Sequence, residues 1–81
     1  MSWVVYILKC NDASFYTGIT TDIDRRLKEH NEGVGAKYTR ARRPVSLIFT
    51  EDHQNRSHAS KREYEIKSLS RKQKEQLAYS K

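Results

Sequence analysis

Residues 3–20 read WVVYILKCNDASFYTGIT and predict a β-hairpin. Aromatic and β-branched side chains occupy both parities of residues 3–9, which indicates a strand that is covered on both faces. Residues 11–14 are turn formers, and Phe15 to Thr20 is expected to return as the second strand. The expected connection is longer than two residues.

The length of that connection decides where two tyrosines of the hairpin lie, because opposite residues of a strand pair share a face. An odd loop, such as residues 10–14 with Lys9 opposite Phe15, places Tyr6 and Tyr16 on one face. A plain four-residue loop at 11–14 places them on opposite faces. The sequence leaves both registers open.

Cap and turn residues predict the remaining elements. Asp22 is expected to cap a helix from Ile23 to about Asn31, which Gly33 and Gly35 end. Residues 36–43 are expected to form an irregular basic stretch, and Pro44 opens a third strand from Val45 to Thr50. Asn55 or Ser57 is expected to cap a helix that runs to about Leu69. Ser70 and Gln73 predict a capping box for a short final helix to about Tyr79. The order β-β-α-β-α-α predicts an α+β fold, in which helices cover both faces of a three-stranded, mainly antiparallel sheet.

The composition indicates one basic domain that spans residues 1–81. Hydrophobic residues make up 36% of the chain and charged residues 32%, which is typical of a thin core under a charged surface. The net charge of +6 and the pI of about 9.7 attract polyanions, most commonly nucleic acid. An anionic membrane surface is the second candidate, but no strongly amphipathic basic helix supports it.

The cysteine and histidine content argues against disulfides and zinc. Cys10 is the single cysteine, and the apolar run from Trp3 to Leu8 is too short for a signal peptide or a membrane span, so a cytoplasmic protein is expected. The histidines and the cysteine match no zinc-ligand spacing, and two of the histidines are expected to be solvated, namely His53 and His58.

Two of the expected helices carry polar residues within an apolar stripe. In the first, Ile23 and Leu27 mark the face turned to the sheet. Arg26 and His30, four residues apart, lie on that same side. In the next helix, Glu63 lies within a stripe of apolar residues, which are Ala59, Ile66 and Leu69.

A charge drawn toward a core costs free energy unless it is paired or takes part in chemistry. One interpretation is therefore a structural ion pair of Glu63 with Arg26 or another arginine. The other is a site assembled from the hairpin tyrosines, the Arg26–His30 pair and Glu63. The tyrosines alone favour a role in the core, whereas Gly18 indicates a close backbone approach or a bulge within its strand.

Four segments in this order resemble the GIY-YIG nuclease superfamily, especially short stand-alone bacterial proteins close to the nuclease domain of an endonuclease that processes branched DNA. The segments are VVY at 4–6, YTG at 16–18, DRRLKEHN at 24–31 and SKREYEIKSLS at 60–70. Both motifs keep their tyrosine, but Val4, Val5 and Thr17 depart from the family letters, and Ile19 stands where some members carry a lysine.

The resemblance implies a catalytic role for each of five residues. Tyr16 would activate or position the attacking water, and Tyr6 would orient water or a phosphate oxygen. Arg26 would hold the scissile phosphate, and His30 would hydrogen-bond the tyrosine or water and shuttle protons. Glu63 would bind one divalent cation, Mg²⁺ or a substitute such as Mn²⁺. Such a site suits the charge neutralisation that phosphodiester cleavage needs.

The basic stretch places four cations and an aromatic residue in seven positions, which are Lys37, Tyr38, Arg40, Arg42 and Arg43 with two uncharged neighbours. One interpretation is a solvated charge run. The other is a clamp on the nucleic-acid backbone, in which Tyr38 stacks on a base. No base-reading module is visible, so recognition by shape or junction is expected, on DNA that is branched or single-stranded.

Three functions therefore compete. The first is a metal-dependent DNA endonuclease, which the presence of all five candidate residues favours. The second is a nucleic-acid-binding module of the same fold with little or no turnover. The third is an accessory domain that becomes active only with a protein partner.

Overall fold

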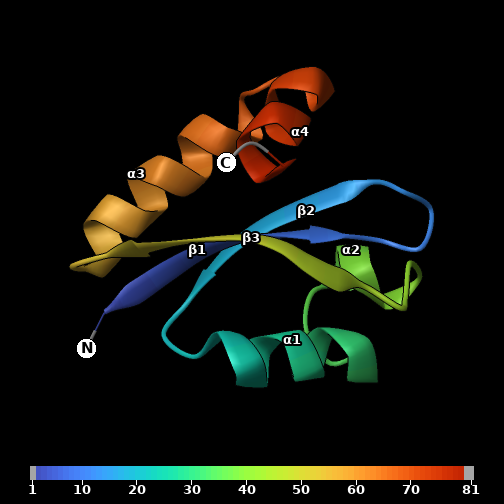
Figure 1. The fold of residues 1–81 in the computed structure, drawn as a ribbon. Helices are drawn as coiled ribbons and strands as arrows, with labels where there is room; N and C mark the ends of the chain where they lie inside the picture. The colour runs from blue at the N-terminus through green and yellow to red at the C-terminus, as the bar shows by residue number, and fades with distance from the viewer. Residues whose placement is uncertain (1, 80–81) are drawn as a thin grey trace.

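The computed structural model describes residues 2–79, which form a three-stranded antiparallel sheet between two layers of helices (Figure 1). The elements in chain order are β1 Trp3–Lys9, β2 Phe15–Thr20, α1 Ile23–Glu32, α2 Lys37–Arg40, β3 Ser46–His53, α3 Arg56–Lys67 and α4 Arg71–Tyr79. The strand order is β2-β1-β3, so the apolar first strand lies in the centre. The predicted α+β architecture is confirmed.

The β1–β2 hairpin has the odd loop of the two registers. Lys9 lies opposite Phe15, which leaves residues 10–14 as the connection. Tyr6 then lies opposite Gly18, and Tyr16 lies opposite Leu8. Since opposite residues share a face, Tyr6 and Tyr16 point to the same side of the sheet.

Each face of β1 supplies one half of the core. Val5 and Ile7 pack against α3, with Ala59 and Ile66 fully buried among them. On the other face, Tyr6 and Leu8 pack with residues from the hairpin loop, α1 and the segment just before β3, namely Cys10, Ile23, Leu27 and Val45. Figure 1 shows the two layers, with α3 and α4 above the sheet and α1 and α2 below it.

The predicted caps position the helices. The side chains of Asp22 and Asn55 each accept a hydrogen bond from the backbone N–H three residues further on, at 3.1 and 2.9 Å. Gly33 ends α1 in the left-handed conformation, at φ 84°. Ser70 and Gln73 form the predicted capping box, with reciprocal side-chain to backbone bonds.

The structure corrects three expectations. The stretch 36–43 is not irregular throughout, because Lys37–Arg40 forms a single helical turn. β3 runs to His53, three residues beyond Thr50, since its polar end pairs with β1. His53 is not solvated: it is half-buried, and its Nε2 lies 2.8 Å from Glu51 Oε1. None of the helices within residues 2–79 is long and apolar enough to cross a membrane.

Candidate active site

A buried pair of Tyr6 and His30 forms the centre of the site. His30 is 0% exposed and Tyr6 is 1% exposed, and the Tyr6 hydroxyl lies 2.9 Å from His30 Nε2. His30 comes from the last turns of α1, whose Ile23 and Leu27 pack on the sheet beneath it. The apolar stripe of α1 therefore turns His30 into the core, as its spacing predicted.

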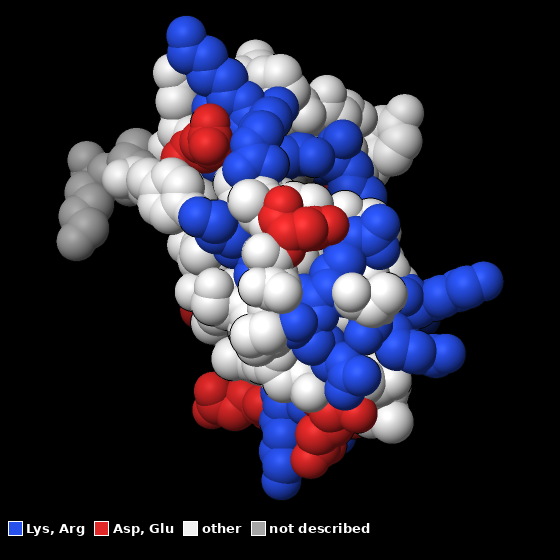
Figure 2. Space-filling model, turned by 90° about the vertical axis from the view of Figure 1, so that its right-hand side faces the viewer, with Lys and Arg blue, Asp and Glu red and all other residues white. Residues whose placement is uncertain are grey.

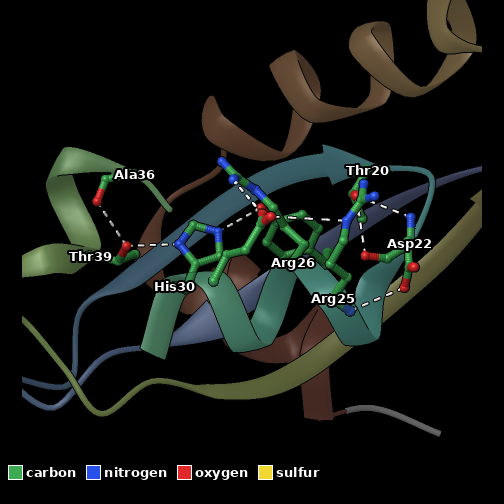
Figure 3. Close-up of polar contacts among 9 residues, drawn as sticks. Thr20, Asp22, Arg25, Arg26, His30, Ala36 and Thr39 are labelled. Carbon is green, nitrogen blue, oxygen red and sulfur yellow. Dashed lines mark hydrogen bonds and ion pairs between the residues drawn. The ribbon is translucent and has the colours of Figure 1, made fainter. Parts of the chain in front are cut away.

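Thr39 of α2 binds the other side of the His30 ring. Its hydroxyl oxygen lies 2.8 Å from His30 Nδ1 and donates to the Ala36 carbonyl at 3.0 Å (Figure 3). A hydroxyl carries one proton, so a Thr39 that donates to Ala36 accepts from Nδ1–H. In the neutral ring Nε2 then has a free lone pair, to which the Tyr6 hydroxyl donates.

Burial keeps both members of the pair uncharged at neutral pH. It lowers the pKa of His30 from 6.5 to about 4, and the positive charge of Arg26 adds to this effect. Burial also raises the pKa of Tyr6 from 10.0 to about 12, while the neighbouring Arg26 guanidinium works against the rise. Tyr6 is therefore a phenol that donates a hydrogen bond, and His30 is a neutral acceptor.

Tyr16 and Tyr38 extend this pair into an aromatic wall. The ring centroid of Tyr16 lies 5.2 Å from that of His30, 6.4 Å from that of Tyr6 and 5.9 Å from that of Tyr38. The Arg42 guanidinium covers the Tyr38 ring at 3.9 Å. No hydrogen bond found among residues 2–79 involves the Tyr16 hydroxyl, which leaves that group available for a water molecule or a ligand.

Two glycines let backbone pass close to the central pair. A Cβ at Gly18 would lie 2.5 Å from the Tyr6 hydroxyl oxygen, so only glycine fits opposite this tyrosine without displacement. Gly18 thus marks a close approach and not a bulge, since the β1–β2 register is regular there. A Cβ at Gly35 would lie 2.6 Å from His30 Nδ1, which places the loop before α2 directly on the ring.

Arg26 lies at the edge of the pair, where its side chain is 29% exposed. Its NH1 donates to Glu29 Oε1 at 3.1 Å, and the guanidinium has further N–H donors for other acceptors. Its charge lowers the pKa of His30 and opposes the rise in that of Tyr6, which places it beside both groups.

Glu63 lies on α3, across the sheet from α1 (Figure 1). Its side chain is 23% exposed and its Oε2 lies 3.2 Å from Lys67 Nζ. Glu63 contributes to the raised pKa of Tyr6, so its charge lies near the central pair. Glu63 and Arg26 do not form the ion pair that was one interpretation of the sequence. Glu63 pairs with Lys67, and Arg26 pairs with Glu29.

The donor set available to a metal ion is small. Residues 2–79 contain no cluster of three or more His, Cys, Asp or Glu side chains arranged to hold a metal. A single half-buried carboxylate such as Glu63 fits Mg²⁺, which keeps several of its waters and binds protein through one or two carboxylates. It does not fit a structural zinc, which needs four protein ligands.

The basic stretch combines exposed cations with arginines that hold the fold. Lys37 and Arg40 are exposed on α2. Arg42 donates to Asp12 Oδ2 at 3.1 Å and to the Tyr38 carbonyl at 2.8 Å, and so ties the hairpin tip to α2. Arg43 donates to the Arg40 carbonyl at 2.8 Å. Figure 2 shows Lys and Arg side chains along most of the face that lies to the right in Figure 1, with fewer acidic side chains among them.

Sequence reasoning assigned no individual role to Thr39. Thr39 lies in a basic stretch without apolar periodicity, and its contact with His30 depends on the turn between the two helices. A pair of closely spaced glycines, Gly33 and Gly35, was the available signal that backbone returns over the end of α1.

The chain is similar to known proteins over almost its whole length. A UPF0213 protein of Halobacterium salinarum is 58% identical over 73 residues, which cover 90% of this chain and 95% of the relative. The solution NMR structure of a UPF0213 protein from Bacillus halodurans is 55% identical with a TM-score of 0.60, and covers 95% of this chain and 82% of that one. A solution NMR structure of a protein from E. faecalis is 54% identical with a TM-score of 0.64, over 94% and 81% of the two chains.

The fold, the four motifs and these relatives agree with a direct match to a domain family. Residues 2–76 match the GIY-YIG catalytic domain, which includes every element from β1 to most of α4. This chain therefore belongs to the GIY-YIG family, a family of nucleases.

Proposed function

We propose that the protein is a metal-dependent endonuclease that hydrolyses phosphodiester bonds of DNA and selects its substrate by shape more than by base sequence. The observation that carries this proposal is the buried Tyr6–His30–Thr39 chain beside Arg26 and Tyr16. A buried polar chain in a domain of 81 residues costs free energy that an apolar core would not. A catalytic role accounts for that cost.

Arg26 would bind the scissile phosphate. Its guanidinium is part-exposed and holds Glu29 through one N–H, so its remaining donors can form the bidentate contact that arginine makes with phosphate. Because the charge lies beside the central pair, it would also stabilise the negative charge that develops on the phosphate oxygens.

The two tyrosines would have different roles. Tyr6 donates a hydrogen bond to His30 and its pKa is raised to about 12, so it stays a phenol, and its oxygen would orient the attacking water by accepting a hydrogen bond from it. Tyr16 borders the same ring, and its hydroxyl makes no hydrogen bond among the described residues. Tyr16 would therefore hold and activate the attacking water.

Nucleases of the GIY-YIG family generally use a divalent metal ion. Glu63 would hold it here as Mg²⁺ or Mn²⁺, after exchange of its ion pair with Lys67. The ion would stabilise the charge on the leaving oxygen when bound.

Cleavage assays test the proposal directly. Linear, flapped and branched DNA are incubated with the wild type, Tyr16→Phe and Glu63→Gln, with and without Mg²⁺. Each variant should lose at least about 100-fold in cleavage rate, as is usual for an essential acid–base or charge-stabilising group. Tyr64→Phe and Glu65→Gln, exposed residues of α3, are the matched controls and should keep the wild-type rate.

Each alternative function has its own outcome in this assay. A wild type that binds DNA but cleaves none of the substrates would be a nucleic-acid-binding module. Cleavage that appears only after a cell extract is added would indicate an accessory domain with a protein partner. Cleavage that survives in Glu63→Gln would remove Glu63 as the metal ligand.

The cytoplasm is the proposed compartment, because the single cysteine, Cys10, is buried and free.

The exposed cations of α2 would bind the DNA backbone. Lys37 and Arg40 are exposed and can bind phosphates, whereas Arg42 and Arg43 also hold the loop through hydrogen bonds. The candidate nucleic-acid-binding residues therefore differ in role. They are Lys37, Tyr38, Arg40, Arg42 and Arg43. A base that stacks on Tyr38 would compete with Arg42 for the ring face that the guanidinium covers.

Neutralising only the two exposed cations tests this surface without loosening the loop. Lys37→Gln with Arg40→Gln should lower the slope of log affinity against log salt by about 2, if each contacts one phosphate. Lys61→Gln, on α3 across the sheet, is the control and should leave the slope unchanged. An unchanged slope in the double variant would exclude α2 from the interface.

A further inference from the structure

We propose that Thr39 is a positioning residue that holds His30 in its Nδ1–H tautomer, so that Nε2 accepts a hydrogen bond from the Tyr6 hydroxyl. The three side chains come from α2, α1 and β1 and form one buried line of hydrogen bonds. The role of this line in cleavage rests on the proposed function, whereas the tautomer itself is a property of the free protein.

The donors and acceptors around the ring favour one arrangement. Thr39 is 0% exposed, so no bulk water replaces its partners. Its proton goes to the Ala36 carbonyl at 3.0 Å, and its oxygen receives Nδ1–H at 2.8 Å. Every buried side-chain nitrogen and oxygen of the described residues has a hydrogen-bond partner, and this arrangement satisfies the whole line.

The opposite tautomer leaves a proton without an acceptor. An Nε2–H would donate to the Tyr6 oxygen, and the phenol proton would then have to turn toward Arg26. Arginine only donates hydrogen bonds, and Tyr6 is 1% exposed, so the phenol proton would be buried without a partner. Thr39 would also have to give up Ala36 in order to donate to Nδ1.

The backbone around Thr39 is built to bring this hydroxyl to the ring. Gly33 turns the chain back at a φ of 84°, and Gly35 passes so close to His30 that a Cβ would lie 2.6 Å from Nδ1. Thr39 is then the buried residue of the single turn α2. The short helix thus presents one side chain inward, and that side chain binds the histidine.

The tautomer matters for cleavage because it decides whether the Tyr6 hydroxyl offers its lone pairs or its proton to other groups. With its proton held by Nε2, the phenol oxygen keeps its lone pairs for Arg26 or for a water molecule beside the phosphate. A mixture of tautomers would leave this oxygen in two hydrogen-bonding states. Substrate binding would change little, whereas the turnover of bound substrate would fall.

Thr39→Val and Thr39→Ser separate the hydroxyl from the shape of the side chain. The ring nitrogens of His30 are read by ¹⁵N NMR in the free protein, which reports directly which one carries the proton. Wild type and Thr39→Ser should show Nδ1–H, whereas Thr39→Val should show Nε2–H or a mixture. In cleavage assays, Thr39→Val should lower kcat by about 10- to 100-fold with little change in KM, as is typical of partners that orient a catalytic group.

Each outcome of these measurements decides the proposal. An Nε2–H signal in the wild type overturns it, even if Thr39→Val does not fold. A Thr39→Val protein that keeps Nδ1–H overturns it as well, and a fall in kcat would then show a packing role only. A wild type that cleaves no DNA refutes the proposed nuclease function, while the NMR result in the free protein still decides the tautomer.

Discussion

Lowering the pH from 7 to 5 should destabilise the protein through His30 alone. The folded state holds the pKa of His30 at about 4, against 6.5 for a free histidine. Between these two pKa values, His30 is protonated in the unfolded chain but not in the native state, so the free energy of unfolding falls as the pH falls. The loss is about 2 kcal/mol at pH 5 and approaches roughly 3 kcal/mol at pH 4.

This loss is large for a domain of 81 residues. It corresponds to a fall in Tm of roughly 10 °C at pH 5. The carboxylates whose pKa the fold lowers, Asp12 and Glu51, contribute mainly at lower pH, because their ordinary values are 3.8 and 4.5. The window from pH 7 to pH 5 therefore isolates the histidine.

Urea unfolding measured across this window tests the reasoning. His30→Gln should have a lower stability at pH 7 but almost no slope between pH 7 and pH 5. His58→Gln removes an exposed histidine in the first turn of α3 and should keep the wild-type slope. The reasoning fails if the wild type is equally stable at pH 7 and pH 5, or if His30→Gln keeps the full slope.

Three further predictions follow from single contacts. Gly18→Ala should destabilise the protein by about 1–3 kcal/mol in urea unfolding, because its Cβ would meet the Tyr6 hydroxyl at 2.5 Å; a neutral change would show that the ring moves freely. Glu29→Gln should tighten DNA binding about fivefold in a titration at low salt, because it removes a carboxylate 3.1 Å from Arg26; weaker binding would mean that Glu29 instead orients the arginine. Ser70→Ala should cost about 1 kcal/mol and speed amide exchange in α4, whereas unchanged exchange would exclude the capping box as its anchor.

Local chemistry predicted most of the elements. Three short polar side chains cap helices as the sequence indicated, namely Asp22, Asn55 and Ser70. Such a side chain before an apolar stripe is favoured because it accepts a hydrogen bond from a free backbone N–H of the first helical turn. The spacing of Ile23 and Leu27 also predicted that Arg26 and His30 face the sheet, and His30 is fully buried there. Capping bonds and helix-face spacing both involve residues within about one helical turn of each other, so the local sequence is enough to predict them.

The features that the sequence missed depend on contacts between distant segments. The hairpin register needed the length of the loop at 10–14, which turn residues alone left open. The last residues of β3 read as polar loop, yet Glu51 pairs with Val5 of β1, and Arg62 of α3 binds its carboxylate at 2.9 Å. Thr39 has no periodic neighbours, and its position is set by the turn after α1 and by the ring of His30.

The net charge of +6 overstates the positive charge that is available to bind a nucleic acid near the site. Arg26 binds Glu29, Arg42 binds Asp12 and Lys67 binds Glu63, so several cations of this region are partly neutralised within the fold. Of these carboxylates, Glu29 borders Arg26, which is proposed to bind phosphate, and Glu63 is itself the proposed metal ligand.

A DNA phosphate that reaches Arg26, and a cation that reaches Glu63, would each replace a partner that the free protein already supplies. The free site is thus electrostatically balanced around a neutral centre of Tyr6 and His30. Binding of both ligands together would keep that balance, because the phosphate adds negative charge at Arg26 while the cation adds positive charge at Glu63. Affinity for DNA should consequently rise with Mg²⁺ more than simple screening allows, and Glu63→Gln should abolish that rise.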